Sequence, residues 1–146
     1  MAAANRRAIR EAVVRSIFEC EFRDCARFHE EVFVRNMLEM EMPSYDVDFA
    51  KALLTAVFSH DSEFKEWIEK LAPDWPYSKI ARLDRAVICA GLAELKYLCV
   101  SLDIPPKVTL NEYVEITKAY SDDPSRKFVN GVLSSALKEL DFPANA

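Results

Sequence analysis

The sequence contains only two glycines, Gly91 and Gly131, and neither stands where a turn is expected. Both lie in stretches whose apolar residues recur with helical spacing. Because glycine costs a helix interior about 1 kcal/mol relative to alanine, we expect each glycine to mark a close contact between two helices. In the segment KFVNGVL at 127–133 we also expect Asn130 to be buried. A buried amide needs hydrogen-bond partners, so Asn130 would either hold the end of a neighbouring helix or face a ligand.

Helical spacing continues along the whole chain, and no segment shows the alternation typical of a strand. Helices are predicted at 5–22, 28–42, 44–57, 61–71 and 80–99, with a sixth introduced by Pro105 and Pro106 and a seventh introduced by Asp123 and Pro124. The segment 80–99 is the most apolar, so we expect it at the centre of the bundle. The sequence therefore predicts an all-α fold, a compact bundle of about seven helices that forms a single domain over residues 1–146.

Three helix starts carry capping signals. Asp61 and Asp123 are acids at expected N-caps, and Pro124 follows at the first helical position, which proline favours. Thr109 and Glu112 match the capping box, in which the glutamate reaches back to the N–H of the cap residue. These signals predict where three helices begin and account for Glu112 as a capping residue.

Composition restricts the class of protein. Hydrophobic residues make up 51% of the chain, which argues against disorder. No apolar run approaches the roughly 20 residues of a membrane span, and the first ten residues lack the apolar segment of a secretory signal. We therefore expect a cytoplasmic protein.

The four cysteines show neither a C-x-x-C pair nor zinc-ribbon spacing. We expect them to be reduced thiols in the core. The alternative is a metal site that includes Cys20, Cys25 and His29, but no fourth ligand is evident. We therefore expect no metal and no other cofactor.

Charge is unevenly distributed along a chain whose net charge is −5. Residues 1–18 hold four arginines and one glutamate, a balance of +3, whereas residues 19–69 hold thirteen acidic and five basic residues, a balance of −8. Arg6, Arg7 and Arg10 fall on one side of the first predicted helix, because positions three and four apart are neighbours. Arg126 and Lys127 stand at the start of the last helix, where backbone N–H groups also favour anions. Such residues either bind nucleic acid or form an ordinary solvated helix face.

Signals of catalysis are weak. The sequence contains no phosphate-binding loop, dinucleotide-binding, nucleophile-elbow or H-E-x-x-H motif. It has two histidines and no Glu-x-x-His pair, so a carboxylate di-iron bundle is unsupported. We therefore expect no catalytic residues and no enzymatic activity.

The second half of the chain resembles the NusB family of bacterial transcription antitermination factors. The resemblance is carried by the segments LDRAVI at 83–88, EL at 94–95, IPPKV at 104–108, NEYVE at 111–115 and KFVNGVL at 127–133, with Lys118 between the last two, and it extends to the arginine-rich start of the chain. It implies an all-helical fold of two small subdomains. It also implies a non-enzymatic adaptor in transcription antitermination, which binds boxA RNA of ribosomal RNA transcripts together with the small-subunit ribosomal protein NusE and so acts with the transcription elongation machinery.

Transferred residue by residue, the resemblance implies an RNA-binding surface and a protein-partner surface. The partner surface includes Phe18 and Asp84. The RNA-binding residues are Arg6, Arg7, Arg10, Lys118, Arg126 and Lys127. The alternative is a helical protein-interaction module that has lost RNA binding, which the acidic net charge would allow.

The chain departs from the family pattern at several positions, and Asp122 and Asp123 place acidic residues beside Arg126 and Lys127. Cys89 stands where the family usually has arginine, so we expect Glu94 or Glu115 to lack an ionic partner. Ala8 occupies a position that is often basic. Phe18 replaces a common tyrosine and removes a hydroxyl from the expected partner surface.

Overall fold

The computed structural model describes residues 2–142, with side chains described from residue 6 onward. This part of the chain forms seven α-helices and two short 3-10 segments and contains no strand, which confirms the predicted all-α fold. None of these helices is long and apolar enough to cross a membrane. In chain order the elements are α1 (Ala2–Arg23), η1 (Ala26–Phe28), α2 (His29–Glu39), α3 (Val47–Ser59), α4 (Asp61–Leu71), η2 (Tyr77–Lys79), α5 (Arg82–Tyr97), α6 (Pro106–Tyr120) and α7 (Asp123–Glu139).

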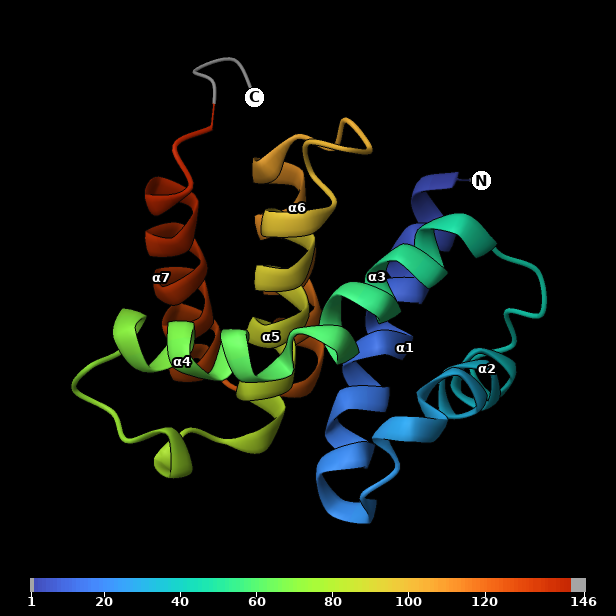
Figure 1. Ribbon diagram of the computed structural model, residues 1–146, viewed down its shortest axis with the longest axis horizontal. Helices are drawn as coiled ribbons and strands as arrows, with labels where there is room; N and C mark the ends of the chain where they lie inside the picture. Colours follow the sequence, from blue (N-terminus) through green and yellow to red (C-terminus); the bar gives the residue numbers. More distant parts are fainter. Residues whose placement is uncertain (1, 143–146) are drawn as a thin grey trace.

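Helix α5 lies at the centre of the molecule, as expected for the most apolar segment, and it contacts α1, α3, α4, α6 and α7. Every residue from Asp84 to Leu95 is buried. A helix that is covered on all sides has no solvent face, which explains why its sequence is apolar nearly all round. Figure 1 shows α1, α2 and α3 grouped on one side of α5, with α4 and α7 on the other.

The two glycines differ in their surroundings. A Cβ atom built on Gly91 would lie 2.9 Å from Cδ2 of Leu133 on α7 and 3.5 Å from Cδ2 of Tyr113 on α6, so the expected close contact is confirmed there. The same expectation is wrong for Gly131, whose Cβ would meet nothing within 4 Å. Asn130 is also exposed rather than buried. Both residues fall on the outer side of α7, because its buried residues (Val129, Val132, Leu133 and Ala136) form a stripe with a period of 3.6 on the other side.

Several helix ends differ from the predictions by one to three residues. Helix α2 ends at Glu39 rather than at residue 42, and α3 begins at Val47 because the Asp46 carboxylate accepts a hydrogen bond from the N–H of Phe49 at 3.1 Å. Asp61 is the first residue of α4 rather than its N-cap. The N-cap of α7 is Asp122, one residue before the predicted one, and its carboxylate accepts from the N–H of Ser125 at 3.0 Å.

The predicted capping box at Thr109 and Glu112 is wrong. Helix α6 already begins at Pro106, after Pro105 as N-cap, because a proline in the first turn lacks only an N–H that needs no helical partner. Thr109 is therefore inside the helix, where its buried hydroxyl donates to Glu94 at 2.6 Å. The side chain of Glu112 points to α1 instead of back to the helix start, as described below.

The cysteines also divide into two pairs. Cys20 and Cys25 are joined as a disulfide, with their Cα atoms 4.7 Å apart, so the prediction of reduced thiols is wrong for this pair. Their sulfur atoms are bonded to one another instead of sharing a metal with His29, whose Nδ1 lies 2.8 Å from the carbonyl oxygen of Ala26. Cys89 and Cys99 are free and buried, as predicted.

Candidate nucleic-acid interface and partner surface

Arg7 lies on the N-terminal half of α1 and is held by a carboxylate on α6. Its Nε and Nη2 donate to the two carboxylate oxygens of Glu112 at 3.0 and 2.6 Å. This bidentate hydrogen bonding lowers the pKa of Glu112, against the opposing effect of partial burial. More than half of the Arg7 side chain (55%) remains exposed, so its other N–H groups can reach a ligand in solvent.

Arg10 is a buried residue and not part of a solvated face. Its Nε and Nη2 donate to the Glu94 carboxylate at 2.8 and 2.7 Å, and Glu94 also accepts from Thr109 and from the Tyr113 hydroxyl at 2.9 Å. Burial lowers the pKa of Arg10, but hydrogen bonding to Glu94 and the charges of Glu94 and Glu112 contribute to a net rise of the pKa. The expectation that Glu94 lacks an ionic partner is therefore wrong. Arg10 joins α1 to α5 and is too enclosed to bind a phosphate in solvent.

Arg6 lies beside Arg7 and is partly exposed. Its Nη2 is 3.5 Å from a carboxylate oxygen of Asp46, just before α3, and its guanidinium lies 4.7 Å from the centre of the Phe49 ring. Its Nε is buried and has no hydrogen-bond partner in the described structure. Arg6 and Arg7 are thus the two accessible arginines at this end of α1.

The other three predicted RNA-binding residues lie near the junction of α6 and α7. Lys118 is exposed, and its Nζ is 4.0 Å from Glu115, which is a weak ion pair. Arg126 is half-buried and pairs with Asp123 at 3.2 Å, and Lys127 is exposed. Of the acidic residues Asp122 and Asp123 beside this basic point, Asp123 thus engages one of its two cations.

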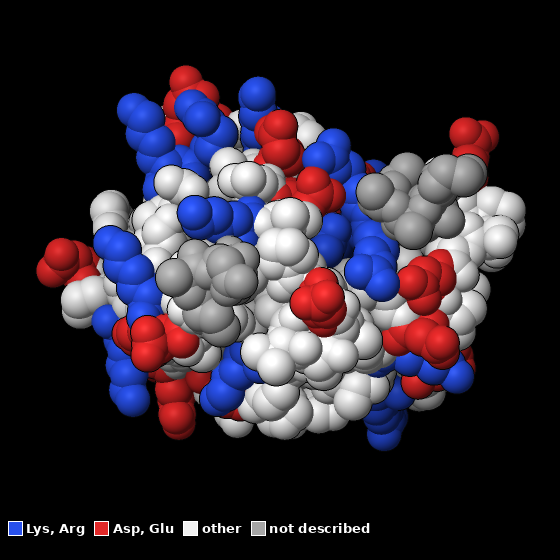
Figure 2. Space-filling model, turned by 90° about the horizontal axis from the view of Figure 1, so that it is seen from above, with Lys and Arg blue, Asp and Glu red and all other residues white. Residues whose placement is uncertain are grey.

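Two contacts define how these cations are spaced. Arg7 pairs with Glu112, and Arg15 donates to the Tyr120 hydroxyl at 2.9 Å, so α1 and α6 run parallel in this region. Lys118 lies about 9 Å farther along α6 than Glu112, at a rise of 1.5 Å per residue. The structure therefore places the cations at two separate positions along the bundle instead of in one cluster. Figure 2 shows the molecule from above the view of Figure 1, from the side on which the N-terminal end of α1 lies. On this face Lys and Arg are interspersed with Asp and Glu.

Phe18 lines a cavity of about 470 Å³ on the C-terminal half of α1, which we call the Phe18 groove. Its lining residues are Val14, Arg15, Phe18, Glu19, Phe22, Arg23, Asn36, Leu83 and Tyr120. The rings of Phe18 and Phe22 meet edge to face with centroids 5.0 Å apart, and Phe22 is 55% exposed. The guanidinium of Arg82 lies 4.3 Å from the centre of the Phe22 ring. A partly exposed aromatic pair with a neighbouring cation is typical of a protein-binding surface.

Sequence reasoning missed Phe22, Leu83 and Tyr120 as groove residues. One signal could have revealed Phe22: it stands four residues after Phe18, so that the two rings share one side of α1. The apolar residues Ile9 and Val13, which are fully buried, lie on the opposite side of that helix. Leu83 and Tyr120 come from other helices, and no local pattern places them here.

Asp84, the second predicted partner residue, faces a different cavity. It lines a space of about 280 Å³ together with Trp75, Phe128 and other residues. Only 5% of its surface is exposed. One carboxylate oxygen accepts from the Ser125 hydroxyl at 3.0 Å, and the other has no partner in the described structure. Burial raises the pKa of this carboxyl group. Phe18 and Asp84 therefore do not share a cavity, although Leu83 and Asp84 are neighbours in the chain.

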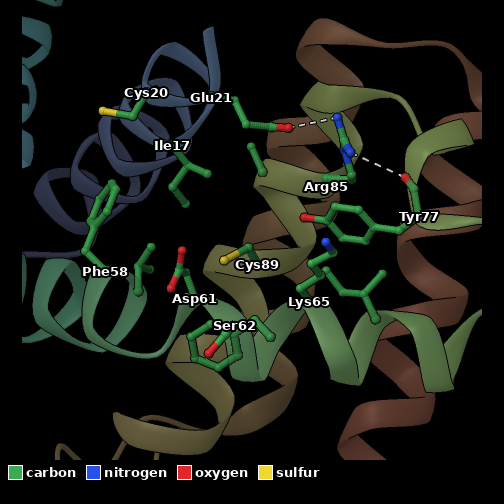
Figure 3. Close-up of a pocket in the computed structure, with 14 residues that line it drawn as sticks. Ile17, Cys20, Glu21, Phe58, Asp61, Ser62, Lys65, Tyr77, Arg85 and Cys89 are labelled. Atoms are coloured by element: carbon green, nitrogen blue, oxygen red, sulfur yellow. Dashed lines mark hydrogen bonds and ion pairs between the residues drawn. The ribbon is translucent and has the colours of Figure 1, made fainter. Parts of the chain in front are cut away.

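A third cavity, of about 290 Å³, lies between α1, α4 and α5 (Figure 3). At its edge Arg85 pairs with Glu21 at 2.8 Å. The sulfur of Cys89 points into the cavity, at the position where an arginine was expected from the family pattern. Burial raises the pKa of this thiol to about 12, so it stays protonated.

The described structure is thus helical, with accessible cations at one end of α1 and an aromatic groove at the other. These two features are typical of a protein that binds other macromolecules. The chain belongs to the NusB family, whose family model matches residues 7–138.

Individual relatives agree with this assignment. The chain is 34% identical over 142 residues to the transcription antitermination protein NusB of Dehalococcoides mccartyi (strain CBDB1), a match that covers 97% of this chain and 95% of the relative. It is similar to the solved structure of T. maritima NusB, with a TM-score of 0.76 and 30% identity over 92% of this chain and 91% of that one. It is also similar to a chain in a crystal structure of antitermination factors NusB and NusE in complex with dsRNA. That likeness has a TM-score of 0.74 and 26% identity, and it covers 93% of this chain and 98% of the other.

Proposed function

We propose that the protein is a non-enzymatic RNA-binding adaptor in transcription antitermination. It binds boxA RNA of ribosomal RNA transcripts together with ribosomal protein NusE, and it acts in the cytoplasm with the transcription elongation machinery. The observation that carries this proposal is the likeness, over nearly the whole chain, to a structure of NusB with NusE and RNA.

The proposed RNA contacts are the accessible cations. Arg6 and Arg7 at one end of α1, and Lys118, Arg126 and Lys127 near the α6–α7 junction, would neutralise phosphates and so position the RNA. Arg10 is left out because it is buried and paired with Glu94. Its role is to fix α1, and with it Arg6 and Arg7, relative to α5.

The proposed NusE contacts are the Phe18 groove and the neighbouring cavity at Asp84. The exposed ring of Phe22 supplies apolar area. The unpartnered carboxylate oxygen of Asp84 is buried, so it would accept a hydrogen bond from a partner only after the cavity opened. A buried acceptor without a partner is costly, so satisfying it would favour the complex.

The alternative function is a helical interaction module that does not bind RNA. It is favoured by the pairing of Arg7 with Glu112, because an RNA phosphate would have to share or displace that carboxylate. The net charge of −5 opposes RNA binding as well.

A titration of labelled boxA-like RNA at several salt concentrations, with and without NusE, separates the two functions. The test variant is Arg7→Ala with Lys127→Ala. The matched control, Lys51→Ala with Lys70→Ala, removes the same charge from exposed residues of α3 and α4. For single strands the log–log salt slope changes by about 0.7 per neutralised phosphate, so the test variant should bind RNA more weakly with a slope flatter by about 1.4. The control should behave as wild type.

NusE binding provides the second measurement. Both double variants should keep their affinity for NusE, since neither changes the Phe18 groove. Equal RNA affinities and salt slopes for the two variants would exclude the proposed RNA contacts. If wild type also failed to bind RNA while it bound NusE, the interaction-module function would replace the adaptor.

A further inference from the structure

Cys20 and Cys25 lie at the turn where the chain reverses from α1 into α2. Cys20 is in the last turns of α1, and Cys25 precedes η1. Between them Asp24 adopts a left-handed conformation (φ 49°), and its N–H donates to the carbonyl of Cys20 at 3.1 Å. The disulfide therefore links the end of α1 to the start of the segment that leads into α2.

The remaining cysteines cannot compete for this bond. Cys89 and Cys99 are buried, and burial raises the pKa of their thiols to about 12 and about 11. Thiol–disulfide exchange needs a thiolate and access for the attacking group. Figure 3 shows that the sulfur of Cys20 points away from the cavity into which Cys89 points. Cys25, in contrast, is only half-buried and lies in a connecting segment.

Cys20 itself lines the third cavity, but three residues close to it in the chain line the Phe18 groove. Glu19, Phe22 and Arg23 line that groove within three positions of Cys20. Glu19 pairs with Arg23 at 2.7 Å and also with Arg35 of α2. The disulfide and the Glu19–Arg35 pair hold the same part of α1 to the segment that contains α2, so the bond bears directly on the shape of one groove wall.

We propose that Cys20 and Cys25 form a reversible redox site that adjusts the affinity of the Phe18 groove for its protein partner. The proposal rests on the proposed function for the identity of that partner as NusE and for a cytoplasmic location. Disulfides that occur in the cytoplasm are usually transient and redox-sensing.

The reaction is thiol–disulfide exchange with a low-molecular-weight disulfide such as glutathione disulfide. One cysteine thiolate attacks the glutathione disulfide to form a mixed disulfide and release one glutathione thiolate. The second cysteine then attacks the protein sulfur of that mixed disulfide and releases the second glutathione. Two cysteine thiols are oxidised to one disulfide, and one glutathione disulfide is reduced to two thiols. Excess glutathione reverses both steps.

The oxidised protein is expected to bind NusE more tightly. In that state the last turn of α1 is already held in place, whereas the reduced protein must order Phe22 and Arg23 when the partner binds. Ordering one such side chain corresponds to a loss of affinity of about twofold to tenfold.

The experiment combines alkylation of the native protein with NusE titration. Wild type is equilibrated with either reduced glutathione or glutathione disulfide, treated with iodoacetamide and mapped by mass spectrometry. Alkylation of Cys20 and Cys25 should be seen only in the reduced sample, and Cys89 and Cys99 should stay unmodified in both. Oxidised wild type should bind NusE more tightly than reduced wild type. The double variant Cys20→Ser with Cys25→Ser should bind NusE equally under both conditions.

The outcomes are separable. Alkylation of Cys20 and Cys25 to the same extent in both samples would overturn the redox site, whatever NusE does. A reversible disulfide with equal NusE affinities would overturn its influence on the groove. If NusE bound in neither state, the proposed function would fail along with that influence, while the alkylation map would still decide whether the disulfide is reversible.

Discussion

The pairing of Arg10 with Glu94 illustrates how little a residue's type says about its role. Arg6, Arg7 and Arg10 look equivalent in the sequence, yet only Arg10 has a fully buried carboxylate as its partner. Glu94 could not be assigned as that partner from the sequence because it lies 84 positions away on another helix. Its surrounding donors, Thr109 and Tyr113, come from a third helix.

Replacing Arg10 by alanine should therefore be far more costly than replacing Arg7. Arg10→Ala leaves a buried charge on Glu94 and should lower the free energy of unfolding by about 3–5 kcal/mol. Arg7→Ala removes a pair whose arginine is more than half exposed and should cost about 1 kcal/mol. Urea denaturation of the two variants measures both values. Similar midpoints would show that Arg10 is solvated after all.

The two glycines provide a second comparison at the level of single residues. Gly131→Ala should stabilise the protein by about 0.5–1 kcal/mol, because the new methyl group meets nothing and glycine disfavours a helix interior. Gly91→Ala gains the same helix propensity but forces the buried Leu133 side chain to move, at a cost of about 1–3 kcal/mol. Thermal denaturation should therefore give opposite shifts, or at least a clearly lower midpoint for the Gly91 variant. A larger stabilisation at Gly91 would contradict the close packing of α5 on α7.

At the level of elements, the sequence predicted the type and order of the helices but not all of their ends. Apolar periodicity is a property of a whole segment, so it survives local exceptions. A helix end depends on one hydrogen bond, and more than one residue nearby can make it. Asp122 and Asp123 are both suitable caps for α7, and only the tertiary structure chooses between them. Thr109 and Glu112 fit a capping pattern, but their side chains are used to connect α6 to α5 and α1.

The connection of α1 to α6 should be sensitive to pH. Hydrogen bonding from Arg7 lowers the pKa of Glu112 below its usual 4.5, so the ionised form stabilises the folded state at neutral pH. This contribution is present above pH 4.5 and is lost as the pH falls through the lower pKa of the folded state. Glu112→Gln should thus be less stable than wild type at pH 7, and the difference should shrink below pH 4. Urea midpoints across this range measure it, with Glu115→Gln, an exposed neighbour on α6, as control.

At the level of the whole molecule, α1 carries two surfaces at its two ends. Phe22→Ser should weaken NusE binding and leave RNA binding without NusE unchanged, because Phe22 lies in the Phe18 groove and away from Arg6 and Arg7. Leu38→Ser, at a similarly exposed position on α2, is the matched control and should bind both ligands as wild type does. Calorimetric titration with NusE and fluorescence titration with RNA measure the two effects. Equal NusE affinities for the two variants would place the partner elsewhere.

The sequence anticipated the class of fold and the general location of the cations, but it did not anticipate the grooves. The cations follow from their position on a helix, which local spacing defines. The Phe18 groove needs α1, α2, α5 and the end of α6 together, so no segment of the sequence contains it. The Cys20–Cys25 bond was also missed, because a spacing of five residues fits no common cysteine motif.

Three arginines of α1 have partners that come late in the chain. Arg7, Arg10 and Arg15 are bound by Glu112, Glu94 and Tyr120. Synthesis proceeds from the N-terminus, so α1 leaves the ribosome long before any of these partners has been made. The charge of Arg10 must stay hydrated during that time, and α1 can settle into its final position only after α5 and α6 have emerged. The packing of α1 is therefore completed only near the end of translation. The surfaces at both ends of α1 are held in place only from that point on.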